Sequence, residues 1–149
     1  MIKIALYQPD IPQNLGAMIR LCGCMGASLD IIEPCGFIYD ERKIRSSAMD
    51  YYDKIDITRH NCWGGFYDLY HGKRRIILMS TKAAMPYTDF KFREGDILLA
   101  GRESAGVPDN VHEVVDNRIF IPMQAGFRSL NIVNATSMIL GEAIRQIEH

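Results

Sequence analysis

Three short stretches of this 149-residue sequence place polar side chains beside glycine, soon after apolar runs. They are NLGAMIR at 14–20, GRESAG at 101–106 and IPMQAGFRSLNIVNA at 121–135. Glycine at the end of a strand permits positive φ and exposes backbone N–H groups, which the polar edge of a ligand can bind. The arginines, carboxylate and amides beside these glycines could hold such a ligand or stabilise charge that develops on it.

The first stretch predicts a helix with a single arginine on a face of small residues. Positions i, i+4, i+7 and i+11 share one helix face, and here they hold Gly16, Arg20, Gly23 and Ala27. Such a face usually packs closely against another element, with the arginine at its margin. Alternatively, it admits a ligand while Arg20 supplies a fixed cation; spacing alone favours packing. Pro12 is expected in the first turn, where Asn14 could be the cap.

The second stretch could form a ligand-binding loop or an ordinary turn. Glu103 lies between Gly101 and Gly106, where it could counter a cationic ligand or orient Arg20. The alternative is a turn that carries a solvated pair of Arg102 and Glu103. Neither G-x-x-x-x-G-K-[ST] nor G-x-G-x-x-G occurs, so a nucleotide would be held in another way.

The third stretch leads from an apolar run into the last predicted helix. Ser129 or Asn131 could cap that helix, and capping alone would explain either residue. Asn134 has a weaker reason to lie inside a helix, because asparagine is a poor interior former. The two asparagines face the same way and could read an adenine edge or hold a carboxylate, or they could simply cap and pack.

The elements that would position these stretches alternate along the chain and predict a single α/β domain over residues 1–149. Strands are expected at 2–8, 29–34, 54–60, 74–81, 95–101 and 118–123, and helices at 14–27, 40–53, 62–72, 108–116 and 129–149. The strands are continuous apolar runs, which is typical of a parallel sheet with helices on both faces. Ligands of such sheets bind beyond the carboxyl ends of the strands, where all three stretches lie.

Composition indicates a soluble globular protein, with 48% hydrophobic and 23% charged residues. No apolar run approaches the roughly 20 residues of a membrane helix, and no secretory signal is apparent. Four cysteines without an export signal suggest reduced thiols and a cytoplasmic location. The cysteines at 22–24, with His60 or Cys62, fit no usual zinc spacing, so no metal is expected.

Two basic clusters, at 42–45 and 73–75, could contact RNA although the net charge is −1. The charge argues against a large nucleic-acid footprint, and each cluster could equally be solvated surface. Tyr51 and Tyr52 follow the cluster that contains Arg45. They could stack on the bases of a single-stranded loop, or they could be partly buried packing.

Taken together, the stretches resemble the SpoU-like branch of the SPOUT methyltransferases. That branch is marked by N-x-G-x-x-x-R, then G-x-E-x-x-G, then I-P-[ML] followed by S-[LM]-N-x-x-N/S-A. The matching residues are Asn14, Gly16, Arg20, Gly101, Glu103, Gly106, Ile121, Pro122, Met123, Ser129, Leu130, Asn131, Asn134 and Ala135. The segments ALYQPDIPQNLGAMIRLC and IIEPCGF further resemble the small subgroup that methylates the ribose 2′-oxygen of the wobble cytidine or uridine in tRNA. Arg102 departs from the proline or smaller residue of many relatives.

The resemblance implies a fold, a cofactor and partners. It implies a C-terminal trefoil knot, a homodimer with its site near the interface, S-adenosylmethionine as methyl donor, and the tRNA anticodon stem-loop as substrate. The implied cofactor residues are Met79, Gly101, Ile121, Met123, Ser129, Leu130, Asn131 and Ala135. The implied catalytic residues are Asn14, Glu103 and Arg20, the last working across the dimer interface. Because the chain carries no extra RNA-binding domain, the dimer surface would grip the RNA, with Arg45 and Tyr51 as candidate contacts.

Two alternatives stay open beside this interpretation. The substrate could be ribosomal RNA, or the chain could be a catalytically silent module that binds RNA or nucleotides. Retention of Arg20, Glu103 and Asn131 argues against loss of activity. Arginine stays protonated in proteins, so a cationic role for Arg20, holding a phosphate or stabilising negative charge, is preferred to a role as base.

Overall fold

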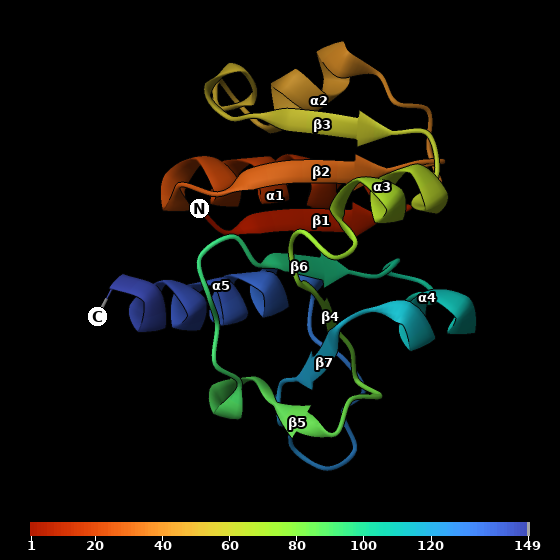
Figure 1. The fold of residues 1–149 in the computed structure, drawn as a ribbon. Coiled ribbons are helices and arrows are strands. Elements are labelled where there is room, and N and C mark those ends of the chain that lie inside the picture. Colours follow the sequence, from red (N-terminus) through yellow and green to blue (C-terminus); the bar gives the residue numbers. More distant parts are fainter. Residues whose placement is uncertain (149) are drawn as a thin grey trace.

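Parallel pairing of seven strands builds the centre of the fold in the computed structural model, which describes residues 1–148 (Figure 1). The strands are β1 (Lys3–Tyr7), β2 (Ser28–Ile32), β3 (Ile57–His60), β4 (Ile76–Met79), β5 (Met85–Pro86), β6 (Ile97–Ala100) and β7 (Asn117–Phe120). Their order is β3-β2-β1-β6-β4-β7-β5, and every pair is parallel. The predicted parallel α/β sheet is therefore confirmed.

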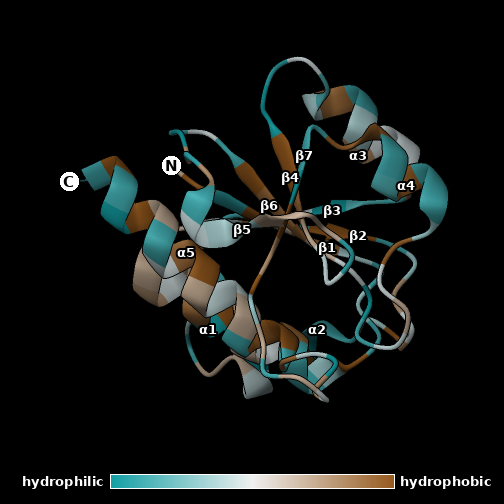
Figure 2. Cartoon of the chain, turned by 90° about the horizontal axis from the view of Figure 1, so that it is seen from below, coloured by the Kyte–Doolittle hydropathy of each residue, from teal (hydrophilic) through white to brown (hydrophobic). Residues whose placement is uncertain are grey.

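Helices cover both faces of this sheet (Figure 2). They are α1 (Pro12–Met25), α2 (Glu41–Ser47), α3 (Trp63–Tyr70), α4 (Asp109–Val114) and α5 (Ile132–Glu148). One core cluster joins the sheet to α1, α2 and α5 through residues such as Leu15, Ile44 and Leu140. A second joins the opposite face to α3 and α4 through Phe66 and Val111. Because both faces are buried, the strands read as continuous apolar runs.

The limits of several helices and strands differ from those expected from the sequence. The predicted helix over 40–53 splits into α2 and a short 3-10 turn, Tyr52–Lys54, and Met49 between them has a φ of 57°. The edge strand β5 was not expected, because it has only two residues and one is proline. Asn14 is not the cap of α1: Pro12 begins that helix after Ile11, which leaves Asn14 inside the first turn.

The small-residue face of α1 packs closely against α2 and the segment that follows it. A Cβ built on Gly16 would lie 2.1 Å from Ser47 Oγ and 3.1 Å from the Ser47 backbone carbonyl carbon. A Cβ built on Gly23 would lie 3.2 Å from the Tyr51 ring. The packing interpretation of this face is therefore confirmed at both glycines.

Sheet order brings the ends of β4, β6 and β7 together, since β4 pairs with both of the others. The loops that leave these strands consequently meet at one edge of the sheet. The trefoil knot that the resemblance implies for this region stays a prediction. Within residues 1–148, no helix is both long and apolar enough to cross a membrane.

Candidate active site

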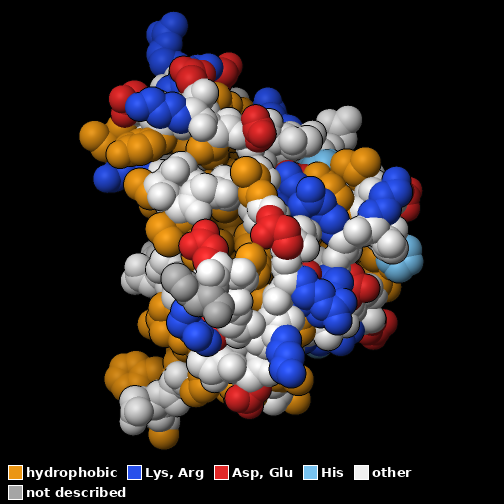
Figure 3. Space-filling model, turned by 60° about the vertical axis from the view of Figure 1, so that its left-hand side comes forward, with side chains coloured by type: hydrophobic (Ala, Val, Ile, Leu, Met, Phe, Trp, Pro, Cys, Tyr) orange, Lys and Arg blue, Asp and Glu red, His pale blue; other side chains and the backbone are white. Residues whose placement is uncertain are grey.

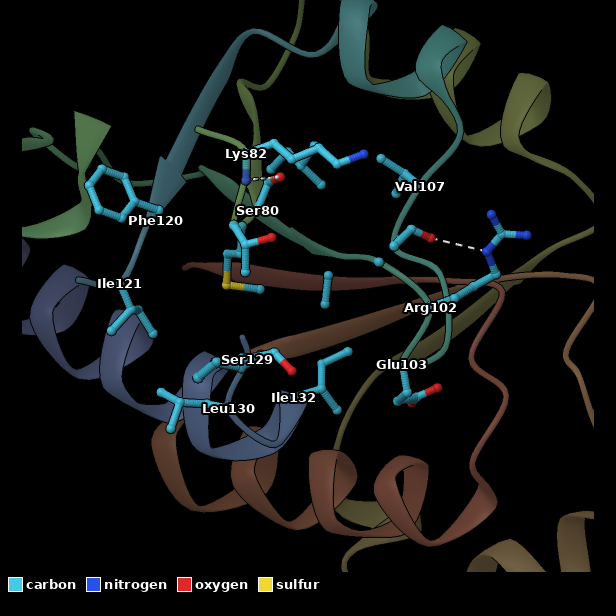
Figure 4. Close-up of a pocket in the computed structure, with 18 of the residues that line it drawn as sticks. Ser80, Lys82, Arg102, Glu103, Val107, Phe120, Ile121, Ser129, Leu130 and Ile132 are labelled. Atoms are coloured by element: carbon cyan, nitrogen blue, oxygen red, sulfur yellow. Dashed lines mark hydrogen bonds between the residues drawn. The ribbon is translucent and has the colours of Figure 1, made fainter. Parts of the chain in front are cut away.

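A cavity of about 730 Å³ lies at the carboxyl ends of β4, β6 and β7 (Figure 4). All three polar stretches contribute to its walls: Asn14 from the first, residues 101–106 from the second, and Ile121 to Ala135 in part from the third. Further wall comes from the loop after β4, with Ser80 and Lys82, and from the start of α4. The expectation that the three stretches meet at the strand ends is confirmed.

Ten of the predicted site residues line this cavity. They are Asn14, Met79, Gly101, Glu103, Ile121, Met123, Ser129, Leu130, Asn131 and Ala135. Figure 4 shows Ile121, Ser129 and Leu130 along one side and Glu103 on the other. Their proximity is a property of the fold, and their roles toward a ligand stay predictions.

The loop after β6 closes on itself tightly. Arg102 and Gly106 exchange two backbone hydrogen bonds of 3.0 and 2.9 Å, and Gly106 has a φ of +64°. A Cβ on Gly101 would lie 2.8 Å from the Gly106 Cα, so no side chain fits at position 101. The Arg102 side chain donates from Nε to the Gly106 carbonyl at 3.0 Å and lies over the Tyr7 ring. Both glycines are thus required by the shape of the loop.

Within one chain Glu103 contacts Asp10 and not Arg20, so the orientation of Arg20 by Glu103 stays a prediction for a pair of chains. Its Oε2 accepts the Asp10 backbone N–H at 2.9 Å. The next residue, Ser104, donates its hydroxyl to Asp10 Oδ2. These bonds tie the loop after β6 to the β1–α1 connection at the wall of the cavity.

The same contact changes the acidity of the two carboxyls in opposite directions. Burial raises the pKa of Glu103, and the neighbouring Asp10 carboxyl raises this pKa further. The neighbouring Glu103 carboxyl in turn lowers the pKa of Asp10. The second Asp10 oxygen, Oδ1, is buried and accepts no hydrogen bond from the described residues. Of the two carboxyls, Glu103 is therefore the better proton acceptor.

Asn131 links two of the three stretches. Its Oδ1 accepts the backbone N–H groups of Val133 at 2.8 Å and Asn134 at 3.3 Å, so Asn131, and not Ser129, caps α5. Its Nδ2 donates to Asn14 Oδ1 at 3.3 Å. Asn134 is exposed on α5 and is not part of the cavity wall. Of the two asparagines, only Asn131 therefore lies where a ligand in this cavity could meet it.

Three predicted residues lie outside the cavity. Arg20 is exposed on α1 with its guanidinium 6.0 Å from the centre of the Tyr51 ring. Tyr51 is half-buried against Gly23, and Arg45 pairs with Glu41 at 2.9 Å and with Asp53. The partly buried interpretation of Tyr51 thus holds in a single copy of the chain.

Two cavity residues that the sequence did not point to have polar atoms without an internal partner. Thr136 Oγ1 is fully buried without a hydrogen bond, and so is the Nε2 atom of His112. Each lines the cavity, together with apolar side chains such as Leu78, Ile119 and Ile139. Buried polar atoms normally have partners, so these two fit a ligand with a flat apolar body and polar edges, as a nucleoside has. Thr136 reads as ordinary helix interior in the sequence and gave no signal.

The family and the relatives that this chain matches are RNA methyltransferases. The profile of the SpoU rRNA Methylase family matches residues 1–141. A tRNA (cytidine(34)-2′-O)-methyltransferase of Beijerinckia indica subsp. indica is 53% identical, over 97% of this chain and 91% of its own length. The protein of the same name from Escherichia coli K12 is 36% identical, over 99% of this chain and 94% of its own.

Solved structures agree with these relatives. One that concerns the 2-OH methylation of C/U34 on tRNA matches with a TM-score of 0.92 at 34% identity, over 98% of this chain and 95% of that one. The SpoU methyltransferase AviRb from Streptomyces viridochromogenes, in complex with AdoMet, matches with a TM-score of 0.85 at 26% identity. That match covers 97% of this chain and 59% of AviRb.

Proposed function

The chain belongs to the SpoU rRNA methylase family, and from this premise we propose that it is a tRNA methyltransferase of the cytoplasm. The proposed reaction moves a methyl group from S-adenosylmethionine to the ribose 2′-hydroxyl of the wobble cytidine or uridine. One observation carries it: the stretches that form the cavity belong to a chain 53% identical, over nearly its whole length, to a protein named for that reaction at cytidine 34.

The cavity suits S-adenosylmethionine in size and chemistry. The bound AdoMet of the AviRb structure supports use of the same cofactor here. When bound, this cofactor supplies a methyl group on a positively charged sulfur, which a hydroxyl oxygen can attack. The residues proposed to hold it come from the loops after β4, β6 and β7 and the start of α5. They are Met79, Gly101, Ile121, Met123, Ser129, Leu130, Asn131 and Ala135, all in the cavity wall.

A second copy of the chain would complete the site. Arg20 lies outside the cavity of its own chain, so as a catalytic residue it would act in the cavity of a partner. Several large apolar side chains reach the surface on and beside α1 and α5, including Ile11, Met25, Leu130 and Met138. Hydrophobic side chains lie among charged ones on the face shown in Figure 3. Exposed apolar groups of this kind support a homodimer interface.

Arg20 would then act as a cation beside the reacting ribose. The guanidinium stays protonated and presents fixed donors, which suits it to a phosphate or to the negative charge that develops on the 2′-oxygen. Asn14 would orient the ribose from the cavity wall of its own chain, where it contacts Asn131.

Arg45 and Tyr51 are proposed to meet the anticodon loop at the edge of this site. Arg45 lies over the Tyr52 ring at 4.5 Å, and Arg20 and Lys54 lie over the Tyr51 ring at 6.0 and 5.7 Å. Aromatic rings and guanidinium planes are the surfaces on which unpaired bases stack. The RNA would have to displace part of these internal contacts.

Nucleoside mass spectrometry tests the proposal directly. Total tRNA that lacks the modification is incubated with the protein and S-adenosylmethionine, then digested to nucleosides. New 2′-O-methylcytidine or 2′-O-methyluridine, absent without protein, is expected. The family's description includes ribosomal RNA, so ribosomal RNA is the second candidate substrate and is treated in parallel. Product in ribosomal RNA alone would overturn the choice of substrate, and no product with either RNA would overturn the proposed activity.

A further inference from the structure

The proposed reaction releases a proton, and the residues assigned so far include no group that accepts it. A ribose 2′-hydroxyl must lose its proton as its oxygen takes the methyl group, and Arg20 is already protonated at every ordinary pH. Among the residues that line the cavity, those able to accept a proton near neutral pH are Glu103, Asp109 and His112. These three residues differ in their neighbours, and only Glu103 lies against another carboxyl group, that of Asp10.

Asp109 and His112 belong to α4. Asp109 is exposed in the first turn of this short helix. His112 lines the cavity from the same element, and its Nε2 is buried without a partner. In Figure 4, Glu103 lies on the side of the cavity nearer to α1, away from Lys82 and Val107. The α1 side also carries Asn14, which is proposed to orient the ribose.

Asp10 is bonded both to Glu103 and to its neighbour Ser104. The Asp10 backbone N–H donates to Glu103 Oε2 at 2.9 Å, and Ser104 donates to the Asp10 carboxyl. Behind Asp10, the chain after β2 packs so closely that a Cβ on Gly36 would lie 2.5 Å from the Asp10 Cβ. The Asp10 carboxyl therefore has little freedom to leave its contact with Glu103.

The orphaned Asp10 Oδ1 supplies the second observation. It is buried and receives no hydrogen bond from the described residues. Since Glu103 is bonded to the Asp10 backbone, we infer that a proton taken up by Glu103 would be donated to the Asp10 carboxyl and would give this buried acceptor a partner. Uptake of a proton by Glu103 is thus compensated by a new hydrogen bond, a property that Asp109 and His112 lack.

We propose that Glu103 accepts the proton of the ribose 2′-hydroxyl and that Asp10 is the residue that positions Glu103 for this step. The 2′-oxygen forms its bond to the methyl carbon while the carbon–sulfur bond breaks and sulfur keeps the electron pair. The hydroxyl proton passes to the Glu103 carboxylate, which then donates it toward Asp10. This inference rests on the proposed function, because it assigns a role within that reaction.

The other titratable side chain with a shifted pKa beside the pair is a thiol. The Cys35 thiol, on the segment after β2, has its pKa raised to about 11, chiefly by burial and by the charge of Glu33. Arg102, on the loop of Glu103, is directed to the Gly106 carbonyl and the Tyr7 ring. Neither group accounts for a pH dependence near neutrality, and the His112→Gln variant distinguishes the carboxyl pair from His112, which lines the same cavity.

The sign of that dependence follows from the direction of the shift. Glu103 must be ionised to accept a proton, and its surroundings raise its pKa. Wild-type kcat should fall as pH falls through this raised pKa, at a higher pH than an ordinary glutamate would give. Replacing Asp10 by asparagine removes the neighbouring negative charge, so the fall should move to lower pH.

The experiment compares single-turnover methylation from pH 5 to 9 in the wild type and four variants, one of which is His112→Gln. Glu103→Gln should lower the rate by about 100-fold or more and abolish the acidic fall. Asp10→Asn should shift the fall to lower pH and lower the plateau about threefold for each unit that the Glu103 pKa drops. Glu113→Gln, a surface carboxyl of α4 outside the cavity wall, should match the wild type. Binding of S-adenosylmethionine by calorimetry shows that each cavity is intact.

Carbon-13 NMR of glutamate carboxyls in the ligand-free protein gives a reading that does not depend on activity. One glutamate should have a pKa above the usual range, and this pKa should be lower in Asp10→Asn. The inference is overturned if Asp10→Asn leaves both this titration and the pH–rate profile unchanged. It is equally overturned if His112→Gln, and not Glu103→Gln, removes the acidic fall. A wild type without methylation of any RNA would instead overturn the proposed function.

Discussion

At the scale of single residues, Arg20 and Glu103 carry opposite charges in different parts of the molecule. Glu103 lies in the cavity wall and is bonded to Asp10, whereas Arg20 lies exposed on α1 beside Tyr51. The pairing that their sequence motifs suggested does not form within one chain. A guanidinium outside the cavity is available to a ligand or to a second copy of the chain.

Replacing Arg20 by alanine should separate catalysis from cofactor binding. Because Arg20 is not in the cavity wall, Arg20→Ala should bind S-adenosylmethionine as the wild type does. Loss of a cation that stabilises transition-state charge should lower kcat by about 100- to 1,000-fold. Calorimetry and single-turnover assays measure the two effects. A variant with normal kcat would remove Arg20 from the reaction.

Asn131 offers a test of its two hydrogen-bonding roles. Asn131→Ala removes the cap of α5, so it should lower the free energy of unfolding by about 1 kcal/mol. Asn131→Asp keeps the capping oxygen beside the helix N-terminus but cannot donate to Asn14. It should retain stability and weaken only the link between the stretches. Urea denaturation at one protein concentration compares the three proteins, and equal destabilisation of both variants would contradict the capping role.

At the scale of elements, the close contact of α1 with α2 depends on the absence of a side chain at Gly16. The nearest atoms to a Cβ there belong to Ser47, and one of them is backbone. This packing holds the start of α1, which carries Asn14 to the cavity wall. The spacing of small residues in the sequence predicted such a contact but could not name its partner.

A pair of glycine-to-alanine substitutions tests this packing. Gly16→Ala overpacks the contact with α2 and should cost about 1–3 kcal/mol of stability. Gly141→Ala on α5 has no atom within 4 Å of its new Cβ. It should stabilise the protein by up to about 1 kcal/mol, because alanine favours helix more than glycine does. Thermal unfolding of the two variants should therefore shift in opposite directions, and equal shifts would argue against the close contact.

The order of elements and the place of the cavity could be predicted from the sequence for a physical reason. Buried parallel strands are apolar throughout, and their polar loops gather at one edge. Strand β5 was not predicted, because a segment of two residues is too short to show a pattern of apolar residues. Asp10 escaped because its partner Glu103 is 93 positions away in the chain. Arg20 and Tyr51 were named as functional residues, yet no local pattern shows whether such side chains face the cavity of their own chain.

At the scale of the whole molecule, the proposed homodimer predicts that two defective chains can complement each other. Gly101→Val should block the cavity, since even a Cβ meets Gly106. Mixed with Arg20→Ala and re-paired, it should restore about a quarter of wild-type activity, because half of randomly paired dimers are mixed and each has one complete site. Methylation rates before and after re-pairing measure this. No recovery in verified mixed dimers would show that Arg20 acts in its own chain.

The pairing of β1 with β6 also has a consequence for the synthesis of the protein. Lys3, near the amino end, lies opposite Ile97, and β4 then joins both β6 and β7. The centre of the sheet therefore cannot assemble while the ribosome is still making the first two-thirds of the chain. Contacts between such distant segments form slowly, so the nascent chain should expose its apolar strands until late in translation and should depend on chaperones during that interval.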